Sequence, residues 1–247
     1  MYKLVKPDGT DFYSGTINYA ENVGKIIRVV DCDPPEAGDC GRGLHSCKNP
    51  NDCFVGAQIP CRAFKVEPID TIVCDKYKTR SQALKIISEV IDLNTLFGWK
   101  YDEVNNPIHP LKLIAPQVSE THILLLKKWS VVWNSVGSSV WDSVRKSVRI
   151  SVFNPVRYSV INSVGNSVYN SVGSVVWNSV GDSIWAYTGS LFPNIKIWNY
   201  IKHEKGTYPF QSAVDLWRAG FVPSFDGVTW RLHAGEKADV VWEGIIT

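Results

Sequence analysis

The hydrophobic pattern is most regular in the middle of the chain, where an aliphatic residue recurs at every fourth position from Val132 to Ile184. Fourteen consecutive tetrads keep this register, thirteen with Val and one with Ile. The residue before the aliphatic one is Ser in 11 of the 14 tetrads, and the residue that closes the tetrad is Asn, Asp or Ser in 10 of them. Self-similarity at a fixed period is the sequence signature of a repeat architecture, so the repeat governs the expected fold class.

A single α-helix does not fit a period of four. At about 100° per residue, the aliphatic stripe would drift by about 40° in each tetrad and would circle the helix over the whole repeat. Ser, Val and Asn are mediocre helix formers, and several glycines and Pro155 interrupt the run. A β-solenoid fits better, because Asn or Asp tolerates each corner, Val points inward and the next residue points outward.

The outward position carries a second period. From Ile161 to Trp185, large residues alternate with glycine, which gives a period of eight. A four-sided coil of about 16 residues keeps this alternation in register from coil to coil, whereas a three-sided coil of about 12 does not. A flat two-sided coil also fits the period but leaves almost no interior, so the alternation favours four sides.

The flanking segments predict ordinary elements. Before the repeat, residues 2–13 have a hairpin signal, residues 25–30 and 63–66 read as strands, and residues 81–93 have the apolar spacing of an amphipathic helix. Residues 119–129 predict a short helix with a basic last turn, which would cap the solenoid.

After the repeat, residues 210–220 predict a short helix that ends at Gly220. An Asp-Gly turn at 226–227 leads into a strand over 228–233, with a partner strand over 240–242. The segment therefore predicts a small α+β packing module.

These elements together predict a mainly β protein in three parts. Residues 1–118 form a β-rich domain with one helix, residues 119–192 form the capping helix and a tetrapeptide-repeat β-solenoid with four sides favoured, and residues 193–247 form the α+β cap. The repeats themselves occupy residues 131–186.

Charge and hydropathy narrow the classes of function. The net charge is +2, from 26 Lys+Arg and 24 Asp+Glu, which argues against a dedicated nucleic-acid coat protein or an acidic tail. No apolar run approaches the ~18 residues that span a bilayer, and the polar start of the chain predicts no secretion signal. We expect a cytoplasmic protein, in a host cytoplasm or a virion, with no membrane partner.

All six cysteines lie between Cys32 and Cys74. In a chain that is not secreted, they are expected to be reduced thiols or metal ligands rather than a disulfide framework. One interpretation is a zinc site, although the spacing matches no standard finger or ribbon; its candidate ligands are Cys40, His45, Cys47 and Cys53, with Cys32 and Cys61 as alternates. The competing interpretations are buried thiols that pack a Gly/Pro-rich loop, and a catalytic pair of His45 with Cys40 or Cys47.

The outward positions of the repeat form a second candidate site. They combine flat aromatic rings with cations, which suits stacking on bases, on sugars or on a protein partner. The alternative is that the rings only shield the coil and pack on the flanking domains. The candidate residues are Trp133, Trp141, Arg145, Arg149, Arg157, Tyr169, Trp177 and Trp185.

Two motifs carry a family resemblance. They are Cys-Gly-Arg-Gly-Leu-His-Ser-Cys at 40–47, followed by Pro-Asn-Asp at 50–52, and Pro-Ser-Phe-Asp-Gly-Val-Thr-Trp-Arg-Leu-His at 223–233. Together with the Ser-Val repeat they resemble a family of uncharacterised bacteriophage and environmental proteins, and the resemblance covers nearly the whole chain. It implies a phage-encoded protein, and it carries no established activity to transfer.

A second resemblance is more distant. The Gly-Leu-His segment at 43–45 is similar to the core of ADP-ribosyltransferases, but the paired glutamates of that chemistry are not evident in this chain. The sequence therefore favours a non-enzymatic binding or assembly module that uses the repeat as its interaction surface, with a protein partner or self-assembly ahead of nucleic acid. The alternative is an ADP-ribosyltransferase-like or other nucleotide-handling enzyme seated in the N-terminal domain.

Overall fold

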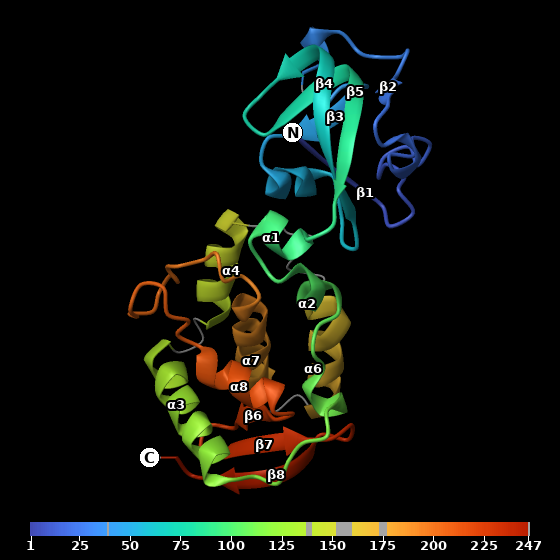
Figure 1. The fold of residues 1–247 in the computed structure, drawn as a ribbon. Coiled ribbons are helices and arrows are strands. Elements are labelled where there is room, and N and C mark those ends of the chain that lie inside the picture. Colours follow the sequence, from blue (N-terminus) through green and yellow to red (C-terminus); the bar gives the residue numbers. More distant parts are fainter. Residues whose placement is uncertain (39, 137–139, 152–159, 173–176, 247) are drawn as a thin grey trace. The chain divides into compact units, whose positions relative to one another are not determined.

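The chain folds as two compact units in a computed structural model, which describes residues 1–38, 40–136, 140–151, 160–172 and 177–246 (Figure 1). The N-terminal unit is Met1–Phe97 and the C-terminal unit is Gly98–Thr247. Both boundaries predicted between three domains, at 118/119 and 192/193, fall inside the C-terminal unit. No helix in the described ranges is long and apolar enough to cross a membrane.

The fold class differs from the expectation. The protein is mixed α/β, 38% helical and 24% strand, so the prediction of a mainly β protein with a β-solenoid is wrong. The strands come from the two ends of the chain, and the described residues of the repeat between them are helical.

The N-terminal unit is built on a five-stranded antiparallel sheet with the order β2-β5-β3-β1-β4. Strand β5 pairs with both β3 and β4, and β1 joins β3 to β4, so the hydrogen-bonded circuit closes on itself. Strand β2 lies outside this circuit and pairs with β5 alone among the described strands. The circuit encloses a core of Val5, Tyr19, Leu44, Phe64, Val66, Leu84 and Ile86. The strands are β1 (Tyr2–Val5), β2 (Ile26–Arg28), β3 (Leu44–Cys47), β4 (Arg62–Cys74) and β5 (Lys78–Val90).

The predicted strands over 25–30 and 63–66 are confirmed in β2 and β4, but the hairpin over 2–13 and the helix over 81–93 are wrong. The first half of the hairpin segment is strand β1, which pairs with β3 and β4, and residues 12–13 lie in a turn. The segment over 81–93 belongs to strand β5, and the short helix α1 (Leu93–Phe97) begins only at its end. A helix would have buried Leu84, Ile87 and Ile91 on one face, whereas in β5 Leu84 and Ile86 are buried and Ile87 is 49% exposed. Pairing with three strands overrides the apolar spacing. The remaining short elements are the 3₁₀ turns η1 (Ala20–Asn22), η2 (Pro35–Ala37) and η3 (Pro50–Val55).

The C-terminal unit packs helices around α7 and against a three-stranded antiparallel sheet of order β6-β7-β8 (Figure 1). The predicted C-terminal helix, turn and strand pair are all present in α8, β7 and β8. The elements are α2 (Tyr101–Asn105), η4 (Pro110–Lys112), α3 (Glu120–Val136), α4 (Val140–Ser151), η6 (Ile161–Gly165), α6 (Asn166–Val172), α7 (Trp177–Ser190), α8 (Gln211–Arg218), β6 (Val222–Phe225), β7 (Trp230–Ala234) and β8 (Asp239–Gly244).

The Ser-Val repeat is helical because no single helix has to carry the whole stripe. The described tetrads are divided among the end of α3, α4, the η6–α6 segment and α7. Within α4, the direction of the valine side chains rotates around the helix axis by only about 80° between Val140 and Val148, so they stay within one apolar face. Val140, Val144 and Val148 are all fully buried. The wide π-helical turn η6 uses more residues per turn and so works against the drift.

The serines and glycines of the repeat also fit helices. Serine hydroxyls donate to carbonyls of the preceding turn, as from Ser183 to Val180 at 2.8 Å, so a serine can be buried without an unpaired polar atom. Gly181 lies where a side chain would collide with Tyr169, since an added Cβ would be 2.1 Å from the Tyr169 Oη. The alternation of large residues and glycine therefore records close helix packing, not the sides of a coil.

Candidate functional site

The aromatic residues of the repeat gather inside the C-terminal unit. Trp133 packs edge-on against Phe225 and Trp230, with ring centroids 5.4 and 5.7 Å apart. Trp141 meets Trp185 edge-on at 6.3 Å, and Arg145 lies over the Trp141 ring at 4.4 Å. Trp133, Trp141 and Trp185 therefore pack against other aromatic rings of the same unit.

Five of the eight predicted surface residues are thus brought into contact within one unit: Trp133, Trp141, Arg145, Tyr169 and Trp185. Trp141 keeps 37% of its surface exposed. Arg157 and the side chains of Arg149 and Trp177 lie outside the described residues.

Asp182 contacts Trp133 of this aromatic cluster, and the sequence analysis did not predict it as a site residue. It is 4% exposed, and it accepts a 2.8 Å hydrogen bond from Trp133 Nε1. Burial raises the pKa of its carboxyl to about 7, although the Trp133 N–H and the backbone N–H of Trp141 pull the pKa down. The only sequence signal was an acidic residue at a tetrad position that is otherwise mostly Asn or Ser.

The Gly-rich motif at 40–43 wraps a buried arginine. Arg80 on β5 is fully buried, and its guanidinium donates to the backbone carbonyls of Asp33, Pro34, Gly38 and Arg42. Gly41 and Gly43 lie directly on the Arg80 side chain, and Cβ atoms added to them would come within 3.0 and 2.9 Å of it. The motif that suggested a chemical site therefore holds a loop around Arg80.

Two of the four proposed zinc ligands meet. Cys47 ends β3 opposite Tyr2 of β1, and Cys53 in η3 donates a 3.5 Å hydrogen bond from its Sγ to the Tyr2 carbonyl, so both cysteines lie beside Tyr2. The interaction with Cys53, followed by the charges of Lys3 and Lys78, lowers the pKa of Cys47 against the opposing effects of burial and of the Asp52 charge. The interaction with Cys47 and burial raise the pKa of Cys53 well above its ordinary value.

The other two proposed ligands have different surroundings. Cys40 is exposed and accepts a hydrogen bond from Lys78 Nζ at 3.2 Å, and His45 lies opposite Arg80 in the pairing of β3 with β5. Across the part of the chain that the structure describes, no group of three or more His, Cys, Asp or Glu side chains is placed to hold a metal ion. Cys40, His45, Cys47 and Cys53 do not form a zinc cluster.

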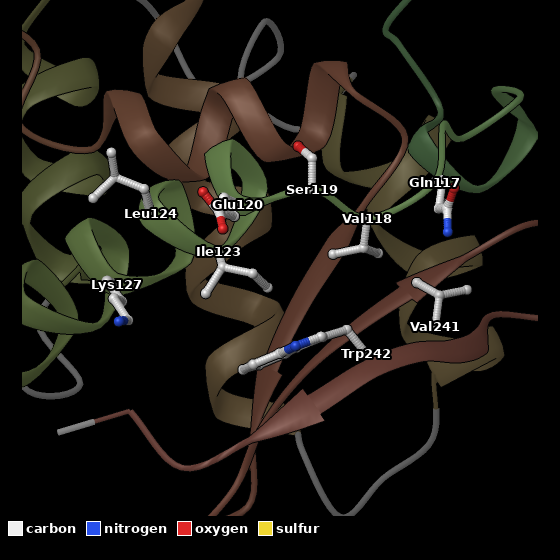
Figure 2. Close-up of a pocket in the computed structure, with 9 residues that line it drawn as sticks. All are labelled: Gln117, Val118, Ser119, Glu120, Ile123, Leu124, Lys127, Val241 and Trp242. Carbon is white, nitrogen blue, oxygen red and sulfur yellow. The ribbon is translucent and has the colours of Figure 1, made fainter.

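A groove lies between the first half of α3 and strand β8 (Figure 2). Its volume is about 760 Å³, within the range of ligand sites. Figure 2 shows the Trp242 ring opposite Ile123, with Val118 and Val241 beside it. The lining residues are Gln117, Val118, Ser119, Glu120, Ile123, Leu124, Lys127, Val241 and Trp242.

A β-bulge shapes the floor of the groove. In the pairing of β7 with β8, His233 is opposite Val240 and Leu232 is opposite Trp242, so Val241 is an extra residue. Successive residues of a regular strand point to opposite faces, whereas here Val241 and Trp242 both line the groove. Sequence reasoning predicted the strand over 240–242, but it gave no signal for a bulge or for its proximity to α3.

The comparisons with known proteins give no relative: no protein-family model, no curated protein and no solved structure matches the chain. The resemblance to bacteriophage and environmental proteins stays a prediction.

Proposed function

We propose that the chain is a non-enzymatic protein-binding module, and that the groove between α3 and β8 holds an extended segment of a partner protein. The observation that carries this proposal is the bulge in β8, which turns both Val241 and Trp242 into one apolar groove. Bulges that re-aim side chains are common beside functional sites.

The position of β8 favours an extended backbone as the occupant. β8 is the outer strand of the order β6-β7-β8, and within the described ranges its other side has no paired strand. An outer strand presents backbone N–H and C=O groups that an extended segment can pair with. Apolar side chains of that segment would pack on Trp242 and Ile123.

The charges on α3 define the partner further. Glu120 and Lys127 both line the groove, and seven residues along a helix span about 10 Å. Four residues of an extended peptide span about 13 Å and place the two end side chains on the same face, which long side chains on the peptide and on α3 can match. The groove is therefore complementary to a peptide with a basic and an acidic residue four positions apart and an aliphatic residue midway between them.

The test is selection from a displayed library of random nine-residue peptides against the full chain. The proposal predicts enrichment of peptides with a basic and an acidic residue four positions apart and an aliphatic residue midway between them, and at least about a tenfold loss of affinity for the selected peptides in Trp242→Ala. Val131→Ala is the matched control, because Val131 is exposed on the same helix outside the groove lining.

Charge reversal makes the test specific. Glu120→Lys should switch the selected residue at that end from basic to acidic. No enrichment, or selected peptides that bind wild type, Trp242→Ala and Glu120→Lys equally, would overturn the proposal; a small molecule or a second copy of the chain as occupant would give that result.

The enzyme alternative has no specific observation in its favour. The Gly-Leu-His segment that suggested a nucleotide site starts at Gly43, which packs on Arg80, and continues as strand β3. We propose a cytoplasmic location, since Cys32, Cys40, Cys47, Cys53 and Cys74 are free thiols, as is usual in reducing compartments.

A further inference from the structure

A loop from a later part of the C-terminal unit lies against helix α4 (Figure 1). The loop begins at Lys196 and closes at Gly206, whose N–H donates to the Lys196 carbonyl at 3.1 Å. Asn199 docks the loop on α4, since its backbone N–H and its side-chain amide both donate to Ser147 Oγ, at 3.1 and 3.0 Å. Compact surface loops whose ends lie close together are frequently functional.

Tyr200, in the middle of this loop, has a backbone conformation that a tyrosine rarely adopts. Its φ is 64°, in the left-handed region that favours glycine. The neighbouring Trp198 is buried edge-on against Tyr208, with centroids 4.9 Å apart, and its N–H donates to His203 Nε2. Tyr200 is nevertheless 56% exposed. Backbone strain persists where the surrounding structure fixes it, and it clusters at ligand sites.

Positive charge lies beside this exposed ring. Lys146 of α4 lies 4.5 Å from the centroid of the Tyr200 ring and donates to its hydroxyl. Arg145 is about 100° from Lys146 around the helix, on the side away from the buried valines, and lies over the Trp141 ring.

The two segments together are strongly basic. Residues 140–148 and 196–206 hold two carboxylates, Asp142 and Glu204, and five cations, which are Arg145, Lys146, Lys196, Lys202 and Lys205. Within the described ranges, none of the five makes an ion pair with a carboxylate. The surface is therefore complementary to an anionic partner.

We propose that α4 and this loop bind single-stranded nucleic acid, with an unpaired base stacked on Tyr200 and the neighbouring phosphates on the five cations. Sites of this kind combine positive charge along the backbone of the strand with an aromatic ring on which any base can stack. An acidic peptide would use the cations, but it would give no role to an exposed ring held in a strained conformation. The proposal goes beyond the peptide groove and does not depend on it.

The experiment measures fluorescence anisotropy of labelled oligo(dT) and oligo(U), each of about 12 nucleotides, with the full chain. The two probes distinguish DNA from RNA as the bound strand. Between about 50 and 200 mM salt, the logarithm of affinity should fall with the logarithm of salt concentration with a slope of about −2 to −3.5, because each neutralised phosphate contributes about −0.7 and the site offers five cations. An abasic strand of the same length should bind about tenfold more weakly, since it keeps the phosphates and lacks the bases.

Substitutions at Tyr200 separate stacking from charge. Tyr200→Asn removes the ring but keeps a residue that tolerates the left-handed conformation, so it should weaken binding about tenfold with no change in the salt slope. Tyr200→Phe keeps the ring and should retain most of the affinity. Tyr13→Asn is the matched control, because Tyr13 is 98% exposed in the N-terminal unit and should not contribute.

A lysine substitution tests the phosphate contacts. Lys202→Gln should make the salt slope shallower by about 0.7, the contribution of one phosphate. Lys128→Gln removes the same charge from an exposed position of α3 and should leave the slope unchanged.

The wild-type chain alone decides the proposal, so a variant that fails to fold does not affect the outcome. Absence of binding at about 50 mM salt would contradict it, as would equal affinity for the abasic and the intact strand. Equal affinity for polyglutamate, or for vesicles of phosphatidylcholine and phosphatidylserine, would also overturn it, because the surface would then be a site for acidic peptides or anionic lipids.

Discussion

Asp182 is the residue at which burial and charge oppose each other most directly. Its carboxyl has an ordinary pKa of 3.8 and a folded-state pKa of about 7, because it is buried below Trp133. Between these two values the folded state holds a proton that the unfolded state has lost. Stability therefore falls as pH rises through this window, by about 1.4 kcal/mol per pH unit, and falls no further above pH 7.

Asp182→Asn should remove this fall, since the amide oxygen can still accept from Trp133 and carries no charge. We expect the variant to gain about 2–3 kcal/mol relative to wild type between pH 5 and pH 8. Urea unfolding followed by tryptophan fluorescence measures this, and all 10 tryptophans lie in the C-terminal unit, so the signal reports on that unit alone.

Asp226→Asn is the control of opposite sign. The N–H groups of Thr229 and Val228 and the Arg231 guanidinium lower the pKa of Asp226, so its contribution is present at neutral pH and is lost as pH falls. Parallel pH curves for wild type and Asp182→Asn would show that Asp182 is not buried as a proton-binding group.

Arg80 shows how one buried cation determines the conformation of a loop. Its guanidinium donates to four backbone carbonyls of residues 33–42, so removal of the side chain takes a donor from each of them, although those of Pro34 and Arg42 also accept from the backbone N–H groups of Ala37 and Asp33. Arg80→Met should destabilise the N-terminal unit by several kcal/mol and Arg80→Lys should not restore it, because a lysine lacks the planar fork of donors.

Hydrogen–deuterium exchange of residues 31–43 is the measurement, with faster exchange expected in Arg80→Met. Arg28→Met is the matched control, since Arg28 makes an exposed ion pair with Asp70 on the same sheet, which is worth at most about 1 kcal/mol. Equal protection of the loop in wild type and Arg80→Met would contradict this role.

At the scale of elements, helix packing in the repeat depends on glycine. Gly181 of α7 receives the ring of Tyr169 from α6, and any side chain at 181 would collide with the hydroxyl. In an open helix Gly→Ala gains about 1 kcal/mol, so the sign of the effect separates close packing from propensity.

Gly181→Ala should therefore destabilise the C-terminal unit by about 1–3 kcal/mol, and Tyr169→Phe should recover part of the loss in the double variant. Asn178→Ala, at an exposed position of the same helix, should be neutral or slightly stabilising. Thermal unfolding of the four variants gives the coupling; a stabilised Gly181→Ala would show that α6 and α7 do not pack as described.

The sequence predicted the elements at both ends of the chain better than the middle. The strands around β1, β4 and β7 and the helix α8 follow from local signals such as alternation, an Asp-Gly turn and a C-terminal glycine. The assignment of residues 81–93 failed because the partners of β5 are distant in sequence and decide between helix and strand.

The solenoid prediction failed for a different reason. On one long helix the valines would rotate around the helix axis and could not all be buried. The described repeat is instead divided among several short helices, and each of them buries only a few of the valines. The same limit applies to the candidate binding surface. The sequence identified its aromatic residues, but it did not predict that Trp133 contacts Asp182 or that Trp141 packs on Trp185 of α7, because these contacts join different helices.

At the scale of the whole molecule, the N-terminal unit holds an antiparallel sheet with a closed circuit of strands, and the C-terminal unit holds the described helical part of the repeat. The residues of the proposed peptide groove all lie in the C-terminal unit.

The helical state of the Ser-Val repeat is the central claim, since the Asp182 environment and the Tyr169–Gly181 contact both depend on it. The most direct test is the set of Cα chemical shifts of the full chain by NMR. The account predicts positive secondary shifts for Val144, Val148, Val168, Val180 and Ile184, as in helices, and negative shifts at these positions, as in the strands of a coil, would contradict it.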